Sequence, residues 1–174
     1  MINFKNIDYL KYGNNRQKEA YIELKELQIF EKLKAYNPIL SGTIPLGIDL
    51  PNSDLDIVCE CENNDEFSDV LYRLFVDKNR FEIKTKVHQG IKSTVAKFET
   101  VRFIVEIFGQ NIPSDKQNAY RHMLIEYKIL KEKGPEFRSE IIKLKHQGLS
   151  TEAAFTQMLG IEGNPYDELL KLEE

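Results

Sequence analysis

Apolar residues recur with the period of an α-helix in the first part of the chain. Between Arg16 and Tyr36 they come every three or four positions, which predicts a helix with one buried stripe. Pro38 ends this helix, because the residue before a proline is disfavoured in the helical conformation. The residues of the stripe are Ala20, Leu24, Leu27, Phe30 and Leu33.

Shorter apolar runs and strict alternation predict strands in the middle of the chain. The segment FEIKTKV, residues 81–87, alternates charged positions with apolar or threonine positions, which predicts a strand with one solvated face. The segments 93–98 and 101–109 are separated only by Glu99 and Thr100, so we expect a hairpin there. Two more strands are expected at residues 38–42 and 55–61, and a helix at residues 63–78.

The last third of the chain has helical patterns. Ser114 and Gln117 have the spacing of a capping box, which predicts a helix that runs to about residue 133 and stops at Gly134 and Pro135. Three shorter helices are expected at residues 136–146, 150–159 and 165–172. We therefore expect one compact unit, with an α/β core at residues 1–112 and an all-helical C-terminal part at residues 113–174.

Composition places the chain among ordinary globular proteins. Of its 174 residues, 41% are hydrophobic and 30% are charged, which excludes a disordered chain and favours one domain. The formal net charge of -4 argues against an extended nucleic-acid-binding surface. No apolar run is long enough to span a membrane, and the N-terminus lacks the apolar segment of a signal peptide, so we expect a cytoplasmic protein. Cys59 and Cys61 are interpreted as a buried, reduced pair, since no histidine lies near them in sequence.

Two aspartates at the start of an expected strand are the first candidates for chemistry. Asp54 and Asp56 are two positions apart, so they project from the same face with α-carbons about 6 to 7 Å apart. Carboxylate oxygens suit Mg²⁺, which keeps waters and substrate phosphates in its shell. Upstream, Gly42 and Thr43 end the preceding strand in a turn that can approach phosphate oxygens. An aspartate pair alone is weak support, because such pairs are common in solvated loops.

The full spacing of this stretch is more specific. Its order is Gly-Thr, three residues, Gly, five residues, then Ser-Asp-x-Asp. This pattern resembles the signature of the nucleotidyltransferase superfamily of polymerase β-like enzymes, and in particular of the small bacterial minimal nucleotidyltransferases. The segments 47–58, 105–123 and 151–172 together resemble an uncharacterised bacterial family within that superfamily, known by a domain-of-unknown-function label. The six matching positions are Gly42, Thr43, Gly47, Ser53, Asp54 and Asp56.

The resemblance implies a fold, a reaction and a set of site residues. The fold would be a mixed β-sheet flanked by helices (α/β, or α+β), and the reaction would be transfer of a nucleoside monophosphate from an NTP, expected to be ATP. Asp54, Asp56 and Glu106 would bind Mg²⁺ or Mn²⁺ and serve as catalytic residues, while Gly42, Thr43 and Ser53 would contact the nucleotide. The acceptor would be a hydroxyl group of a small molecule, a protein or an RNA end, with release of pyrophosphate.

Three features depart from the superfamily's usual pattern. Thr43 stands where serine is commoner, the loop 44–46 lacks the basic residue that relatives often have, and Glu106 stands where aspartate is usual. Glu106 lies within the apolar run VRFIVEIF, where an ionised side chain needs a cation or hydrogen-bond partners. It therefore either completes the metal site and acts as a general base, or pairs with Arg102 or a lysine on its own face.

Polar side chains on the expected helix after residue 114 can be interpreted in two ways. His122 and Glu126 share one stripe with apolar residues, so they either bond each other or line a nucleotide pocket, with Arg121 beside them. Spacing does not choose which of several cations meets a triphosphate: Lys92, Lys97 or Arg102.

Two other functional classes remain open from the sequence. One is a non-catalytic nucleotide- or partner-binding module that retains the nucleotidyltransferase fold. The other is an enzyme of the toxin–antitoxin type that modifies a partner protein.

Overall fold

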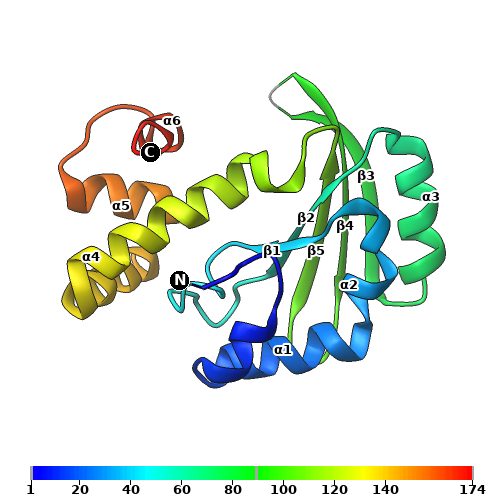
Figure 1. Cartoon of the computed structure of the whole chain (residues 1–174), viewed down its shortest axis with the longest axis horizontal. Coiled ribbons are helices and arrows are strands. Elements are labelled where there is room, and N and C mark those ends of the chain that lie inside the picture. The colour runs from blue at the N-terminus through cyan, green and yellow to red at the C-terminus, as the bar shows by residue number, and fades with distance from the viewer. Residues whose placement is uncertain (1, 89, 174) are drawn as a thin grey trace.

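A computed structural model describes residues 2–88 and 90–173. These residues form a five-stranded mixed sheet in the order β1-β2-β5-β4-β3 (Figure 1). The central pair β2 and β5 is parallel, and every other neighbouring pair is antiparallel. The strands are β1 (Ile39–Ser41), β2 (Leu55–Glu60), β3 (Asn79–His88), β4 (Ile91–Glu99) and β5 (Ile104–Gln110).

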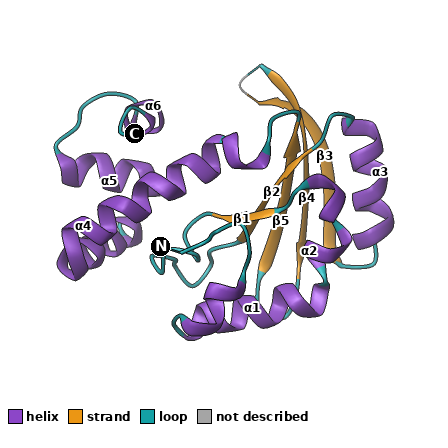
Figure 2. Ribbon diagram, in the orientation of Figure 1, coloured by secondary structure: helices purple, strands orange, loops and turns teal. Residues whose placement is uncertain are grey.

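Helices lie on both sides of this sheet, as the ribbon coloured by secondary structure shows (Figure 2). The α-helices are α1 (Asn15–Leu27), α2 (Ile29–Lys32), α3 (Asn64–Phe75), α4 (Asn118–His146), α5 (Thr151–Leu159) and α6 (Pro165–Leu170). The 3-10 helices are η1 (Asp8–Tyr12), η2 (Lys34–Tyr36) and η3 (Ser114–Lys116). In the described residues no helix is both long and apolar enough to cross a membrane.

The helix predicted for residues 16–36 is interrupted. Gln28 adopts a left-handed conformation with φ of 54° and separates α1 from α2. Leu27 and Ile29 on either side of it are both buried. In a straight helix two residues that are two positions apart point about 200° away from each other. The break therefore lets both side chains enter one core, which the periodicity of the sequence does not reveal.

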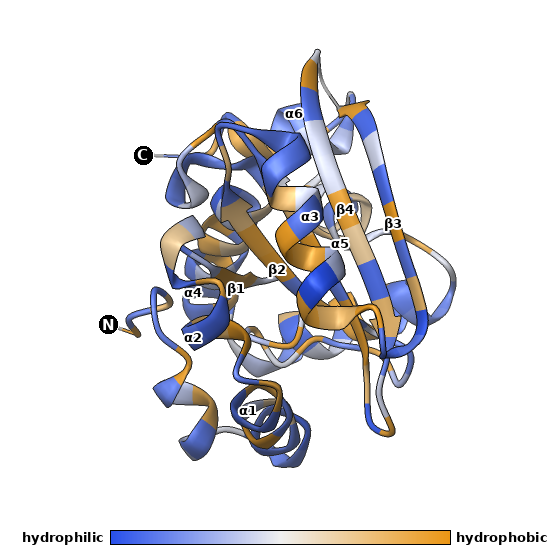
Figure 3. Ribbon diagram, turned by 90° about the vertical axis from the view of Figure 1, so that its right-hand side faces the viewer, coloured by the Kyte–Doolittle hydropathy of each residue, from blue (hydrophilic) through white to orange (hydrophobic). Residues whose placement is uncertain are grey.

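The first core lies between one face of the sheet and helices α1 to α3. Leu55, Ile57 and Cys59 alternate along β2 and all face this core. Phe67 of α3 packs so closely on Gly109 of β5 that a Cβ atom there would lie 2.2 Å from its ring. The residues that alternate with these along β2 and β5 face the opposite side of the sheet. Strand β3, by contrast, is banded in blue and orange along its length, as its alternation predicts (Figure 3).

The second core joins the C-terminal helices to the loop before β2. Helices α4, α5 and α6 pack on one another, and α4 also contacts β1. Ile48 of the loop and Val58 of β2 belong to the same buried cluster as Met123 and Phe155. Helix α4 thus extends from the sheet toward α5 and α6, and it packs on β1 (Figure 1). The division of the chain at residue 112 stays a prediction.

The capping box predicted at Ser114 is wrong. Residues Ser114–Lys116 form η3, and α4 begins at Asn118 without a side-chain cap. The Gln117 side chain is buried and donates hydrogen bonds to the carbonyl oxygens of Cys59 at 2.7 Å and Ile112 at 3.0 Å. It therefore fastens the start of α4 to the end of β2, a long-range contact that local spacing does not report.

Several other local predictions agree with the structure. Strands β4 and β5 form the predicted hairpin, and both cysteines are buried and free. Gly134 breaks α4 with φ of 84° at the predicted position. Side-chain caps at Ser150 and Asn164 begin α5 and α6.

Candidate functional site

One row of polar residues crosses the sheet perpendicular to its strands. Ser41 of β1 is paired with Asp56 of β2, and Asp56 is paired with Glu106 of β5. Glu106 is paired in turn with Lys97 of β4, and Lys97 with Glu82 of β3. Side chains of directly paired residues lie on the same face of a sheet. The row therefore gathers Asp56, Glu106 and Lys97 on the face that α1 to α3 leave uncovered.

Gly42 lies against the Asp56 carboxylate. Its φ of 81° is in the left-handed region, and a Cβ atom built on it would lie 2.4 Å from Oδ2 of Asp56. Only glycine fits a position with both this backbone conformation and this close approach. The carbonyl of the next residue, Thr43, accepts hydrogen bonds from the backbone N–H groups of Leu46 and Ile48, both at 3.2 Å. The Gly-Thr turn is thereby held tightly beside the carboxylate.

Lys97 is the cation that the fold brings to the carboxylates. Its Nζ donates a hydrogen bond to Oδ2 of Asp54 at 2.7 Å and lies 3.8 Å from Oε2 of Glu106. The hydrogen bond to Asp54 is the main reason that the pKa of Lys97 is raised. The other two cations near the motif in sequence, Lys92 and Arg102, pair with acidic side chains of α3 and α1.

Asp56 is held in an environment that resists its negative charge. Burial is the main cause and the neighbouring Glu106 and Asp54 add to it, so the pKa of Asp56 is raised to about 7. Lys97 and Lys145 act in the opposite direction but do not offset the rise. A carboxylate in such a place is stabilised by any additional cation.

The chemistry of these carboxyl groups suits a divalent cation, but their placement does not yet form a complete site. In the described ranges no three side chains of His, Cys, Asp or Glu are placed together so that they could hold a metal ion as they stand. Asp54 is engaged by Lys97, whose ammonium group supplies positive charge at this position. Three carboxylates nevertheless offer the oxygen ligands that Mg²⁺ and Mn²⁺ prefer, and two of them, Asp56 and Glu106, line the same cavity. For Asp54 to become a ligand of such a cation, Lys97 would have to release it.

A cavity of about 390 Å³ adjoins Asp56 and Glu106. It runs from the Gly42-Thr43 turn across β2 and β5 to helices α4 and α5. Asp54 and Ser53 do not line it. The Ser53 hydroxyl accepts a hydrogen bond from the backbone N–H of Leu50 at 2.9 Å and contacts the Thr43 hydroxyl at 3.4 Å. Ser53 is therefore placed to hold the loop together. The polar residues that line the cavity are Ser41, Thr43, Asp56, Lys86, Glu106, Gln110, Gln117, Asn118, His122, Glu126, Thr151 and Glu152.

His122 and Arg121 lie on different sides of α4. His122 lines the cavity, and its Nε2 is 2.9 Å from the carbonyl oxygen of Tyr166. Arg121 does not line this cavity; its guanidinium group pairs with Glu173 and donates to Asn118. The expectation that both face the pocket is therefore wrong for Arg121, because neighbouring residues of a helix point about 100° apart.

The loop between β1 and β2 is held from two sides by side chains that donate to its carbonyl oxygens. From α1, Gln17 donates to the carbonyls of Ile44 at 2.9 Å and Pro45 at 3.0 Å. From α4, Arg138 donates to the carbonyls of Leu46 and Gly47, and Lys145 donates to that of Ile48 at 2.6 Å. We refer to Arg16, Gln17, Arg138 and Lys145 as the loop clamp.

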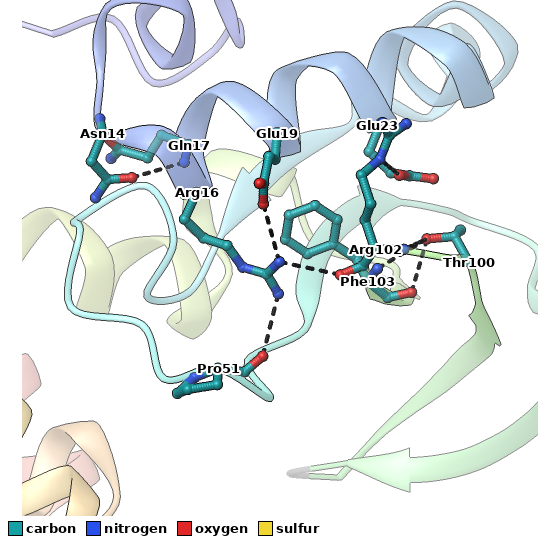
Figure 4. Close-up of polar contacts among 9 residues, drawn as sticks. All are labelled: Asn14, Arg16, Gln17, Glu19, Glu23, Pro51, Thr100, Arg102 and Phe103. Carbon is teal, nitrogen blue, oxygen red and sulfur yellow. Dashed lines mark hydrogen bonds and ion pairs between the residues drawn. The ribbon is translucent and has the colours of Figure 1, made fainter.

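Arg16 completes the loop clamp at the end near the aspartates. Its guanidinium group lies over the ring of Phe103, 3.8 Å from the centroid, and donates to the carbonyls of Arg102 at 3.2 Å and Pro51 at 3.4 Å (Figure 4). Glu19, one helical turn further, pairs with it. Sequence reasoning missed the loop clamp, since its members are far from the motif and each is an ordinary polar residue on a helix.

Comparison with known families adds to this geometry. The sequence profile of the family described as Domain of unknown function (DUF4269) matches residues 22–172. The chain belongs to the DUF4269 family. This agrees with the resemblance to a family of unknown function that the sequence motifs indicate. No curated protein matches the sequence significantly.

Several solved structures of longer chains have a similar fold. Cid1 poly(U) polymerase with Mg 3′-dATP bound has a TM-score of 0.57 and 18% identity, over 90% of this chain and 48% of that one. A cytoplasmic RNA terminal U-transferase has a TM-score of 0.53 and 15% identity, over 76% of this chain and 39% of that one. The GLD-2/RNP-8 complex has a TM-score of 0.55 and 12% identity, over 87% of this chain and 60% of that one.

These likenesses establish the fold of this DUF4269 protein. Its sheet and helices have the nucleotidyltransferase-like α/β arrangement, which confirms the fold class expected from the motif. At identities of 12% to 18% the comparison establishes the fold alone. The chain spans about half or less of the length of the Cid1 chains.

Proposed function

We propose that this protein is a metal-dependent nucleotidyltransferase that transfers a nucleoside monophosphate from an NTP to a hydroxyl group and releases pyrophosphate. The observation that carries this proposal is the pairing of Asp56 with Glu106 on parallel strands, directly beside the Gly42 turn. Enzymes of this fold bind nucleotides: the Cid1 structures contain MgGTP or Mg 3′-dATP. ATP is the NTP that we propose for this chain.

Each residue of the site has a role in this proposal. Asp54, Asp56 and Glu106 would hold Mg²⁺ or Mn²⁺, which when bound supplies positive charge to the triphosphate and the leaving pyrophosphate. The backbone of Gly42 and Thr43 would approach phosphate oxygens. Lys97, once released from Asp54, would contact the same phosphates as a second positive charge.

The transfer itself is a displacement at the α-phosphorus of the NTP. The acceptor oxygen forms a bond to that phosphorus while the bond to the bridging oxygen breaks, and pyrophosphate leaves with the electron pair. The acceptor proton passes to a carboxylate of the site, and Glu106 is proposed for this step because its partly exposed side chain lines the cavity. Transfer to a hydroxyl group thus leaves a phosphodiester on the acceptor.

Calorimetry with a matched pair of variants tests the proposal. Titration of MgATP into the protein should show binding that Asp56→Asn weakens at least tenfold. Glu82→Gln is the control, because Glu82 lies in the same row of the sheet but is exposed on β3 and does not line the cavity. Equal affinity of the protein and Asp56→Asn for MgATP would sink the assignment.

A non-catalytic nucleotide-binding module is the second candidate. The ion pair between Lys97 and Asp54 favours it, because that pair engages one proposed metal ligand. Incubation of the protein with α-labelled ATP, Mg²⁺ and a small-molecule extract separates the two. Label on an acceptor together with pyrophosphate release identifies an enzyme, whereas binding of MgATP without either product identifies the module.

A further inference from the structure

The cavity beside Asp56 has a second acidic end. It is formed by Glu126 of α4 and Glu152 of α5, and the proposed cation site does not use either residue. Glu126 is only 3% exposed and lines the cavity. In the described part of the chain, neither a hydrogen bond nor an ion pair to its carboxyl group is found. A buried carboxyl group without a partner costs free energy unless a ligand satisfies it.

The surroundings of Glu126 are short of positive charge. Burial and the neighbouring Glu152 raise its pKa well above the ordinary value. The charge of Lys145 opposes this shift, but its ammonium group donates a hydrogen bond to the carbonyl oxygen of Ile48 at 2.6 Å. The loop clamp therefore engages the lysine whose charge acts on Glu126.

Glu152 is held at the same end of the cavity. It lies in the first turn of α5, where the positive end of the helix dipole stabilises a negative charge. His122 Nδ1 lies 3.9 Å from its Oε1, beyond hydrogen-bond distance. The Glu152 carboxylate can therefore still accept hydrogen bonds from a ligand in the cavity.

We propose that Glu126 and Glu152 bind an ammonium group of the acceptor, so that the acceptor is a small amine-bearing alcohol. This inference rests on the proposed transfer reaction only in naming the bound amine as the acceptor. An ammonium group offers three N–H donors and a positive charge to two carboxylates. A hydroxyl group of the same molecule would then lie toward Glu106 and Asp56, at the other end of the same cavity.

The size and charge of the cavity argue for this class of acceptor. A volume of about 390 Å³ is that of a small-molecule site. Its ionisable lining consists of four carboxyl groups and one lysine, apart from His122, so the Glu126 and Glu152 end offers no cation to a phosphate-rich RNA end. Those ionisable residues are Asp56, Lys86, Glu106, Glu126 and Glu152.

Binding of matched probes tests the inference without NTP or metal. Three amine-bearing alcohols are compared by calorimetry with neutral counterparts in which a hydroxyl replaces the amine: glucosamine with glucose, serinol with glycerol, and ethanolamine with ethylene glycol. At least one amine should bind five or more times as tightly as its neutral counterpart. If none of the three amines exceeds its counterpart, the inference is overturned.

Variants assign the binding to the two carboxyl groups. Glu152→Gln and Glu126→Gln keep the side-chain shape and should each weaken amine binding about tenfold. Glu140→Gln is the matched control, because Glu140 is exposed on α4 and does not line the cavity. Unchanged amine binding in both Gln variants of the cavity overturns the inference.

Two further measurements distinguish this inference from a nucleobase contact and from the proposed transferase function. If Glu152→Gln weakens binding of ATP but not of UTP, and leaves the amines unaffected, the carboxyl groups contact a nucleobase and the inference is overturned. Asp56→Asn should retain amine binding even when it loses MgATP. The measurement of amine binding can therefore be interpreted even if the proposed transferase function is wrong.

Discussion

The amine of Lys97 spans two carboxylates, with its Nζ 2.7 Å from Oδ2 of Asp54 and 3.8 Å from Oε2 of Glu106. This ammonium group supplies one positive charge where the proposed reaction needs a divalent cation. Binding of the cation and release of Lys97 from Asp54 are therefore linked, because both compete for the same oxygen atoms.

Substitution of Lys97 tests this competition. Lys97→Met should raise the affinity for Mg²⁺ in the absence of nucleotide by about threefold to tenfold, since the competing charge is gone. The same variant should bind MgATP more weakly, because it loses a phosphate contact. Stability should change by at most about 1 kcal/mol, the size of a partly exposed ion pair. Mg²⁺ titration followed by calorimetry measures the first effect.

Lys92→Met is the control for this experiment. Lys92 lies on the same strand, β4, and pairs with the exposed side chain of Asp65. Its loss should leave both affinities unchanged. Equal Mg²⁺ affinity in the protein and in Lys97→Met would contradict the competition.

The contact between Gly42 and Asp56 gives a second prediction. Gly42→Ala places a methyl group 2.4 Å from the carboxylate and adds the strain of a left-handed backbone. We expect it to lose MgATP binding and to lower the free energy of unfolding by about 2 kcal/mol or more. Thermal unfolding and calorimetry measure the two effects.

Gly90→Ala separates backbone strain from the clash. Gly90 has φ of 79°, close to that of Gly42, but no heavy atom lies within 4 Å of an added Cβ. It should lose only about 1 kcal/mol of stability, the cost of the backbone conformation. Equal losses in the two variants would show that the carboxylate contact is unimportant.

The raised pKa of Asp56 predicts how stability depends on pH. The folded protein holds the Asp56 proton up to a pH of about 7, whereas an unfolded chain releases it near pH 4. The folded state thus binds more protons between these values, so its free energy of unfolding falls as pH rises through this window. The contribution of Asp56 is at most about 1.4 kcal/mol for each pH unit. Above pH 7 this stabilisation is lost.

Denaturation of the protein and Asp56→Asn at pH 5, 6, 7 and 8 with a chelator measures this contribution. The stability of the protein relative to Asp56→Asn should fall from pH 5 to pH 7 and then level off. Replacing the chelator by Mg²⁺ should restore stability above pH 7, because the cation takes the place of the proton. Parallel curves for the two proteins would contradict the raised pKa.

The loop clamp gives a prediction about a residue far from the motif. Arg138→Met removes the donors to the carbonyls of Leu46 and Gly47 and leaves two partly buried acceptors without this partner. Amide hydrogen exchange in residues 43–50 should become at least tenfold faster, and MgATP binding about tenfold weaker. Mass spectrometry after exchange and calorimetry measure the two effects.

Lys143→Met is the matched control, since Lys143 lies on the same helix and pairs with the exposed Glu140. It should leave exchange in the loop unchanged. Faster exchange in Arg138→Met with unchanged MgATP affinity would show that the loop conformation does not affect the site.

Local sequence patterns determined the elements of this protein and the face on which its acidic pair projects. The alternation of β2 places Asp56 opposite Leu55 and Ile57, and the position of Glu106 in the middle of an apolar run identifies it as unusual. The glycine and aspartate spacing indicated the nucleotidyltransferase-like fold. These features could be read from the sequence because period and turn chemistry depend on residues within a few positions.

Tertiary structure alone decided which side chains meet. The register of β4 against β5 brings Lys97, and neither Lys92 nor Arg102, to Glu106. The rotation of α4 selects His122 over Arg121 for the cavity, and the packing of α4 on the loop brings Arg138 and Lys145 to carbonyls more than 90 positions away in sequence. Such contacts follow from how whole elements pack, so no local pattern around either partner encodes them.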